Sequence, residues 1–287
     1  MVNGIAPRTG IIIQARLGST RLPGKVLLPL PCSSSTPLLE QIVKRARRAL
    51  RVDIVVVATS DRTEDDAIAG IFRTSGTPCF RGSEDDVLSR FFHAAREHAL
   101  STVVRLTGDN PCIDPRIVDS AVEHHLAGGY DYTVTKGYPT GMNIEVLSFR
   151  ALKQAQEKAS AQDEREHVTP YLTRHPEVFS LSTITAPREL TRPDIRVTLD
   201  TEEDYALQCA VYDLLYPANE LFGLHELLAL FEAKSWLKNI NKRVVQKDLF
   251  PTFDDELREA IRICGLQDLP KVKAFLEAHG HEGRDHH

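Results

Sequence analysis

A short basic loop is the part of this sequence best equipped for chemistry. It follows an apolar run at positions 10–13 and carries the cations Arg16, Arg21 and Lys25. Guanidinium groups offer forked hydrogen-bond donors and an ammonium group offers a compact charge, and both suit phosphate oxygens. A buried strand that leads into such a loop predicts a phosphate-binding site.

Two glycines shape this loop. Gly18 and Gly24 allow backbone conformations that other residues avoid, so that amide N–H groups can converge on an anion. Their spacing differs from that of the P-loop, and Val26 rather than a hydroxyl residue follows Lys25. A magnesium ion would therefore have to be held by other residues. The alternative interpretation is a surface turn with solvated cations.

Two aspartates come directly after apolar runs and are candidate metal ligands. Asp109 follows the run 103–107, and Asp200 follows the run 195–199. In open α/β sheets, ligands bind outside the carboxyl ends of the strands, so both carboxylates are expected to face the basic loop. Magnesium prefers one or two carboxylates together with phosphate oxygens and water. The alternatives are an Asx-turn at Asp109 and a helix cap at Asp200.

The elements that must position these groups alternate between strands and helices through the first 135 residues. Expected strands lie at 10–15, 53–59, 77–81, 101–107 and 131–135. Expected helices lie at 37–50, 63–74, 84–99 and 114–126, with Ser83 as the N-cap of the third. Buried strands that alternate with helices predict an α/β fold, with a mostly parallel sheet and helices on both faces.

The alternation loosens after Lys136. Expected strands lie at 143–147, 178–185 and 195–199, and the last two are expected to return to the sheet. Expected helices lie at 149–158, 163–173 and 201–215, the last capped by Thr201, and the remainder from about 220 to 280 reads as helical and amphipathic.

Composition limits the classes of function. The chain has 287 residues, 42% hydrophobic, with a net charge of −5, which argues against a nucleic-acid binder. The basic loop is a local exception that points to a small anionic ligand. We find no apolar run of about 20 residues and no signal-peptide pattern, so we expect a cytoplasmic protein that does not enter a membrane. The five scattered cysteines form no Cys-x-x-Cys pair, so we expect reduced thiols and no zinc site.

The motifs at 14–25, 105–111 and 197–204 together resemble the cytidylyltransferase family, which makes CMP-activated acidic sugars such as CMP-Kdo and CMP-sialic acid. The stretch 163–171 is similar to the branch named for spore coat polysaccharide biosynthesis protein F. The resemblance covers about residues 10–245 and implies a nucleotide-diphospho-sugar transferase-like (Rossmann-like) fold. It does not specify the sugar, and Asn110 stands where Kdo enzymes typically have Glu.

The resemblance implies roles for individual residues. Catalytic roles fall on Arg16, Lys25, Asp109 and Asp200, of which the two aspartates bind Mg²⁺. Nucleotide-binding roles fall on Ala15, Arg16, Gly18, Ser19, Arg21, Lys25 and Thr107. The candidate contacts to the sugar are Arg105, Asn143, Glu145, Arg165 and His167. Among these, Arg105 could instead pair with a structural carboxylate, Glu145 could face solvent, and His167 could be an ordinary helix histidine.

These roles predict a domain organisation and partners. We expect a nucleotidyltransferase domain at 1–245, which includes a sugar-binding and dimerisation insertion at about 136–185. A helical extension with a polar tail is expected at 246–287, and the resemblance implies no role for it. The expected partners are CTP, a small sugar and a second subunit in a homodimer, because in related enzymes a partner subunit often completes the sugar pocket.

The predicted reaction is attack by a sugar hydroxyl on the α-phosphorus of CTP, with loss of pyrophosphate. One alternative is a GT-A-like glycosyltransferase that consumes a nucleotide sugar, but such enzymes usually hold their metal with Asp-x-Asp, and that motif is absent from the sequence. The other is a non-catalytic nucleotide-binding protein, against which the complete set Arg16, Lys25, Asp109 and Asp200 argues. Cytosine as the base is supported by the resemblance alone.

Overall fold

The computed structural model describes residues 7–245 and 252–279. The chain divides into two compact units, Met1–Ile240 and Asn241–His287. The first contains the sheet and every site residue predicted from the sequence. In the described residues, no helix is both long and apolar enough to span a membrane.

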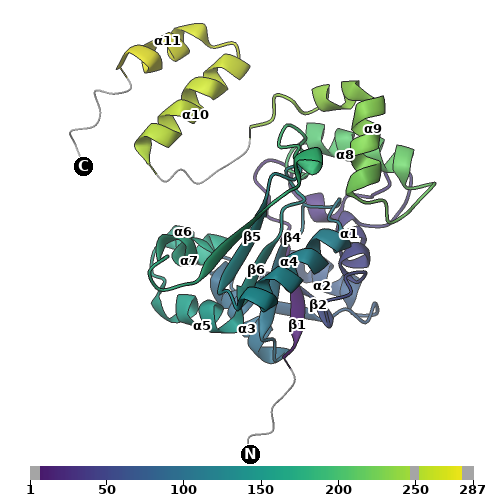
Figure 1. Cartoon of the computed structure of the whole chain (residues 1–287). Coiled ribbons are helices and arrows are strands. Elements are labelled where there is room, and N and C mark those ends of the chain that lie inside the picture. Colours follow the sequence, from purple (N-terminus) through teal and green to yellow (C-terminus); the bar gives the residue numbers. More distant parts are fainter. Residues whose placement is uncertain (1–6, 246–251, 280–287) are drawn as a thin grey trace, which may run out of the picture. The chain divides into compact units, whose positions relative to one another are not determined.

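A seven-stranded sheet organises the first unit (Figure 1), with the strand order β3-β2-β1-β4-β6-β5-β7. Its strands are β1 Thr9–Gln14, β2 Ile54–Ser60, β3 Cys79–Gly82, β4 Thr102–Thr107, β5 Tyr132–Lys136, β6 Glu145–Ser148 and β7 Leu181–Thr185. Only β6 runs antiparallel to its neighbours, β4 and β5. The carboxyl ends of β1, β2 and β4 therefore lie at one edge of the sheet, and the mostly parallel α/β fold is confirmed.

Helices cover both faces of this sheet. The α-helices of the first unit are α1 Leu38–Ala46, α2 Asp66–Phe72, α3 Val87–Glu97, α4 Pro115–Gly128, α5 Phe149–Lys158, α6 Gln162–His167, α7 Pro170–Arg174, α8 Glu202–Leu215 and α9 Leu224–Ala233. Short 3₁₀ segments occur at Lys25–Leu27, Thr63–Asp65, Arg188–Leu190 and Ser235–Asn239.

The two faces have separate hydrophobic cores, because successive strand residues point to opposite sides. Ile11 and Ile13 of β1 pack with α1, α2, α4, α8 and α9. Ile12 packs with α3, α5 and α7. Every strand residue can thus be assigned to a face, which we use below for the polar residues at the strand ends.

The expected strand at 195–199 is wrong. This segment forms only an isolated bridge, from Arg196 to Thr140, and does not join the sheet. Its backbone instead bonds to two loops: Val197 N–H donates to Thr140 O at 2.8 Å and Leu199 N–H to Asp109 O at 2.8 Å. The segment is extended and buried as its apolar residues require, but loops satisfy its backbone groups in place of a strand.

The single helix expected at 163–173 is also wrong, because the backbone breaks between α6 and α7. Val168 has φ 74° and ψ −50° and is buried, and Thr169 N–H donates to His167 O at 2.9 Å. This geometry is that of a classic γ-turn, a rare and strained conformation for a β-branched residue. Pro170 then starts α7, where its missing N–H costs nothing.

Asp86, rather than Ser83, caps α3. Its carboxylate accepts the N–H of Ser89 at 2.9 Å, while the Ser83 hydroxyl accepts the N–H of Asp86 at 3.1 Å. The helix therefore begins at Val87, three residues later than expected. Ser83 and Asp86 are both good capping residues, so the sequence alone did not decide which of them caps the helix. In the structure Asp86 caps α3, and Ser83 bonds to the backbone of Asp86 one turn earlier.

The expectation of reduced thiols is wrong for two of the five cysteines. Cys32 and Cys209 form a disulfide, with Cα atoms 5.5 Å apart, in the usual range for such bonds. Cys79, Cys112 and Cys264 are free. The bond joins residues 177 positions apart, so the sequence spacing could not reveal it. It connects the chain beyond the basic loop to α8, the helix that follows Asp200.

The described part of the second unit is helical. It contains α10 Phe253–Leu266, whose N-cap Thr252 accepts the N–H of Asp255, and α11 Pro270–His279. This unit corresponds to most of the predicted extension at 246–287, of which residues 246–251 and 280–287 lie outside the described residues.

Candidate active site

The ammonium group of Lys25 joins the basic loop to both candidate metal ligands. Its Nζ lies 2.8 Å from Asp109 Oδ2 and 2.8 Å from Asp200 Oδ1, and it also donates to the Leu199 carbonyl at 2.8 Å. These three acceptors come from segments up to 175 residues away in sequence. The structure therefore brings the loop and the two carboxylates together, as the sequence analysis expected.

The loop needs its second glycine to reach this position. Gly24 has φ 69°, a left-handed conformation that favours glycine, and it begins the 3₁₀ segment that carries Lys25 inward. Gly18 is not among the residues with positive φ, so the conformational role expected for it is wrong. A side chain at Gly18 would come 3.5 Å from Glu84 Oε1, an ordinary contact distance.

Asp109 is positioned by the end of β4. The Thr107 hydroxyl donates to Asp109 Oδ1 at 2.5 Å and accepts from Asn110 Nδ2 at 2.8 Å. Gly108 between them lies against β1, where a Cβ would come 3.0 Å from Gln14 O and from the Ala15 side chain. A larger residue at Gly108 would push the turn that carries Asp109 away from the basic loop.

Asp200 is held by arginines and by the start of α8. Arg196 Nη2 and Arg21 Nη2 lie 2.7 Å and 3.0 Å from Asp200 Oδ2. The Asp204 carboxylate accepts the N–H of Asp200 at 3.0 Å and also pairs with Arg196. Thr201 caps α8 as expected, in a capping box with Asp204.

Opposite charges favour the ionised forms of Lys25 and Asp200. Burial alone would lower the pKa of Lys25, but Asp109 and Asp200 raise it above its ordinary value. Burial alone would raise the pKa of Asp200, but Lys25, Arg196 and Arg21 lower it below its ordinary value. At neutral pH Lys25 is therefore a cation and Asp200 a carboxylate, so the site offers both charges to a metal-bound polyphosphate.

The two carboxylates suit a divalent ion that takes its remaining ligands from elsewhere. Asp109 Oδ2 and Asp200 Oδ1 converge on one cationic point, the Lys25 ammonium group. Within residues 7–245 and 252–279, no group of three or more His, Cys, Asp or Glu side chains could hold a metal. Two hard oxygen ligands with open positions match Mg²⁺ bound together with phosphate oxygens and water. The residues present thus fit the predicted metal.

The entrance of the loop is fixed by a buried carboxylate that the sequence analysis missed. Asp65 accepts the N–H of Leu17 at 2.8 Å and the hydroxyl of Ser60 at 2.5 Å. Arg16, just before Leu17, is half-exposed and lies 4.0 Å from Glu166 of α6. The Ser19 hydroxyl accepts the N–H of Leu22 at 3.4 Å, inside the loop. The hydrogen bond from Leu17 to Asp65 thus fixes the backbone next to Arg16, whose guanidinium remains accessible to solvent.

A second polar network lies across β4, β6 and β5. Glu145 accepts from the Arg105 guanidinium, the Tyr132 hydroxyl and, at 3.0 Å, the Thr169 hydroxyl. Both carboxylate oxygens of Glu145 are used, and Thr169 belongs to the strained γ-turn. The network connects the predicted sugar side of the sheet to α6 and α7.

The remaining predicted sugar contacts lie around this network. Arg165 of α6 pairs with Asp86 and donates to Gln156 O at 3.0 Å. The Asn143 side chain donates to Tyr138 O at 3.4 Å and is exposed. His167 is half-buried, and its carbonyl closes the γ-turn. These residues flank the network without forming one cluster.

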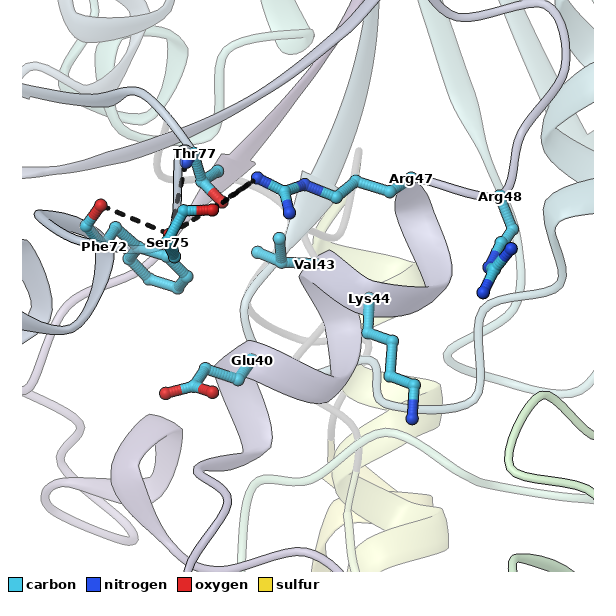
Figure 2. Close-up of a pocket in the computed structure, with 8 residues that line it drawn as sticks. All are labelled: Glu40, Val43, Lys44, Arg47, Arg48, Phe72, Ser75 and Thr77. Carbon is cyan, nitrogen blue, oxygen red and sulfur yellow. Dashed lines mark hydrogen bonds between the residues drawn. The ribbon is translucent and has the colours of Figure 1, made fainter.

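A separate pocket of about 470 Å³ lies between the end of α1 and the loop that leads into β3 (Figure 2). Arg47 there donates to the Thr77 hydroxyl at 2.6 Å, and Lys44 points away from Thr77 along the same helix. The pocket lies at the amino end of β3, and the carboxyl ends of β1 and β4 carry the Lys25 cluster. None of the predicted site residues lines it.

Arg196, Asp204 and Asp65 are the supporting residues that sequence reasoning missed. Asp204 lies in the same motif as Asp200, four residues after it, and this spacing could have indicated that the two carboxylates belong to one cluster. Arg196 lies four residues before Asp200 and carried the same kind of signal. Asp65 carried none, because the Leu17 N–H that it accepts lies 48 residues away in sequence.

Comparisons with known proteins agree with this geometry. The sequence model of a family described as Cytidylyltransferase matches residues 10–240. An uncharacterised protein of Methanocaldococcus jannaschii is 37% identical over 239 residues, which cover 82% of this chain and 95% of that protein. Spore coat polysaccharide biosynthesis protein SpsF of Bacillus subtilis is 40% identical over 206 residues, which cover 70% of this chain and 85% of that protein.

One solved structure is similar along its whole length. The structure of a cytidylyltransferase from Leptospira borgpetersenii serovar Hardjo-bovis superposes with a TM-score of 0.75 at 30% sequence identity. The match covers 84% of this chain and 100% of that chain. Residues 10–240, which the family model matches, contain the basic loop, both aspartates and the polar network.

Proposed function

The chain belongs to the cytidylyltransferase family and is a nucleotidyltransferase enzyme, and from this premise we propose that it transfers CMP from CTP to a sugar hydroxyl in a Mg²⁺-dependent reaction that releases pyrophosphate. The observation that carries this proposal is the contact of Lys25 with Asp109 and Asp200 at 2.8 Å each. A cation on a phosphate-binding loop beside two converging carboxylates is the arrangement that a metal-bound triphosphate requires.

The reaction would need positioning and charge neutralisation more than covalent help from the protein. The acceptor oxygen forms a bond to the α-phosphorus, the bond from that phosphorus to the α,β-bridging oxygen breaks, and pyrophosphate leaves. The hydroxyl proton passes to solvent. Lys25, Arg16 and Arg21 would hold the β- and γ-phosphates and stabilise the leaving group.

Asp109 and Asp200 would hold the magnesium ion. When bound, it would neutralise α-phosphate oxygens and acidify the attacking hydroxyl. For Lys25 to reach the phosphates, its ammonium group has to leave at least one of the two carboxylates. Arg196 and Asp204 would keep Asp200 in place during that exchange, because their contacts to it do not involve Lys25.

The similarity to SpsF favours a sugar used in surface polysaccharide or glycan synthesis, and the family favours cytosine as the base. We propose a cytoplasmic enzyme that acts as a homodimer, as expected from the resemblance of the sequence to enzymes whose sugar pocket a second subunit completes.

A pyrophosphate-release screen tests the proposal. Each of the four nucleoside triphosphates is offered with a panel of acidic and neutral sugars, with and without Mg²⁺. The proposal predicts release from CTP with one sugar class and only with the metal. Release of a free nucleoside diphosphate from a sugar nucleotide would favour a glycosyltransferase instead, and no reaction under any condition would favour a non-catalytic nucleotide-binding protein.

A further inference from the structure

Three buried polar atoms near the candidate active site have no hydrogen-bond partner in the described part of the chain. They are Gln14 Oε1, Arg105 Nε and Asn110 Oδ1. Gln14 ends β1, Arg105 lies in β4, and Asn110 follows β4. Buried polar atoms are nearly always hydrogen-bonded, so three unpartnered ones at the carboxyl ends of two paired strands call for a ligand.

Strand register places these atoms on one face of the sheet. Gln14 is the partner of Thr107 across β1 and β4, and Ile12 is the partner of Arg105. Ile12 and Val103 belong to the core beneath α3 and α5, so alternation puts Gln14, Arg105 and Thr107 on that same face. Asn110 joins them through its hydrogen bond to the Thr107 hydroxyl.

We call these four residues on one face of the sheet the polar strip: Gln14, Thr107, Asn110 and Arg105. One end reaches the metal-ligand carboxylate, because Thr107 donates to Asp109. The other end reaches the network beneath the γ-turn, because Arg105 pairs with Glu145. An acceptor must lie beside the α-phosphate, and the strip begins where Asp109 would hold the metal.

The unpartnered atoms match hydroxyl groups rather than a carboxylate. Gln14 Oε1 and Asn110 Oδ1 accept hydrogen bonds, and Arg105 Nε–H donates one. A hydroxyl group both donates and accepts, so neighbouring sugar hydroxyls can satisfy all three atoms. A carboxylate only accepts, and it would meet two amide oxygens and the charge of Glu145.

We propose that the polar strip binds the hydroxyl groups of the sugar acceptor and that Gln14 is a specificity-determining residue for it. This inference rests on the proposed function and narrows it to the acceptor side. It assigns the strip to neutral hydroxyls of the sugar ring, so any acidic group of the acceptor lies elsewhere. The triphosphate would contact Lys25, Arg16 and Arg21 and not Gln14.

The test uses Gln14→Met in the full chain, which removes the amide and keeps a side chain of similar length. The control is Thr59→Val. Thr59 Oγ1 is also buried without a partner in the described residues. Thr59 lies on the opposite face of the sheet, because it alternates along β2 with Val55 and Val57, which belong to the other core. Both variants are compared with the wild type in pyrophosphate release, using the sugar that supports the fastest release, and in thermal unfolding.

The inference predicts that Gln14→Met raises the KM for the sugar about tenfold, the size expected for one lost hydrogen bond at a desolvated site. The KM for CTP stays within about twofold, because this residue contacts only the acceptor. The melting temperature is unchanged or higher, because an unpartnered buried group has been removed. Thr59→Val changes neither KM value.

Two results would overturn the inference. An unchanged sugar KM in Gln14→Met would show that water or nothing occupies the strip. A fall of the melting temperature by several degrees, with equal losses for CTP and sugar, would show that Gln14 is structural. If Gln14→Met does not fold, Gln14→Asn is measured against the same criteria. Asn keeps the amide group but is one methylene shorter, so its oxygen no longer reaches the sugar. Failure of the proposed function would appear separately, as no pyrophosphate release by the wild type with any sugar, and the inference would then be withdrawn with it.

Discussion

The ammonium group of Lys25 lies 2.8 Å from a carboxylate oxygen of Asp200, although 175 residues separate the two in sequence. This contact, with its counterpart at Asp109, defines the candidate site. It explains why a loop near the start of the domain and the turn before α8 must be folded against each other before either can bind a ligand.

Replacing Lys25 should abolish turnover without unfolding the protein. We expect Lys25→Ala to lower the rate of pyrophosphate release at least about 10²- to 10³-fold, the loss typical for one preorganised charge at a transition state. Circular dichroism should remain that of the wild type, because Arg21 and Arg196 still neutralise Asp200. Lys44→Ala in the separate pocket of Figure 2 is the matched control and should keep full activity. Unaltered turnover in Lys25→Ala would refute its role.

The requirement for metal should follow the two aspartates. Chelation with EDTA should stop pyrophosphate release, and added Mg²⁺ should restore it. Asp109→Asn should raise the Mg²⁺ concentration needed for half-maximal rate, because an amide oxygen is a weaker ligand than a carboxylate for this hard ion. Asp213→Asn, a change on the C-terminal half of α8, is the control. Activity that persists in EDTA would contradict the metal-dependent mechanism.

The stability of the fold should fall with acid because of a buried histidine. Burial lowers the pKa of His125 in α4 to about 4, against the ordinary 6.5, while Asp131 opposes and His124 adds to this shift. Between these values the unfolded chain binds a proton that the folded chain does not, so stability is lost as pH falls from about 6.5 to about 4. This lowering of the pKa corresponds to a loss of about 3 kcal/mol of unfolding free energy.

Denaturant unfolding at pH 7 and pH 4.5 measures this loss. His125→Gln keeps a polar group near the Thr133 hydroxyl, which lies 3.0 Å from His125 Nδ1, but cannot take up the proton. The difference in stability between the two pH values should therefore shrink in this variant. An equal difference in wild type and variant would mean that other groups cause the acid sensitivity.

Thiol titration tests the disulfide between Cys32 and Cys209. Five cysteines less two in the bond leave three free thiols in the denatured protein without reductant, and five after reduction. In the native protein Cys112 should not react, because burial raises its pKa to about 12. Five thiols before reduction would mean that the two cysteines stay reduced, as is usual for cytosolic proteins.

The local pattern of the sequence predicted the parts of this structure that depend on it. The buried strands of the sheet, the helix from Phe149 to Lys158 and the N-cap at Thr201 follow from hydrophobic periodicity and capping chemistry. The chemistry of the basic loop and of the two aspartates followed from residue type and from their place after apolar runs. The prediction of cytosine as the base came from the resemblance to a family alone.

The remainder depends on contacts that no local pattern contains. The segment 195–199 looks like a strand because it is apolar and buried, but its backbone partners are loops around Thr140 and Asp109. The γ-turn at Val168 violates the preference of a β-branched residue, and tertiary contacts such as Thr169 with Glu145 accompany it. Gln14 opens the motif at 14–25, but the sequence assigned it no role, and its buried, unpartnered oxygen is visible only in the fold.

Binding of Mn²⁺ in the presence of CTP, followed by electron paramagnetic resonance, tests the central claim most directly. The free Mn²⁺ signal should decrease when wild-type protein and CTP are both present, beyond what CTP alone causes. Asp109→Asn and Asp200→Asn should each remove most of that additional decrease. Equal binding of the ion by the wild type and both variants would contradict a site in which these two carboxylates and the cations of the loop hold a metal-bound triphosphate.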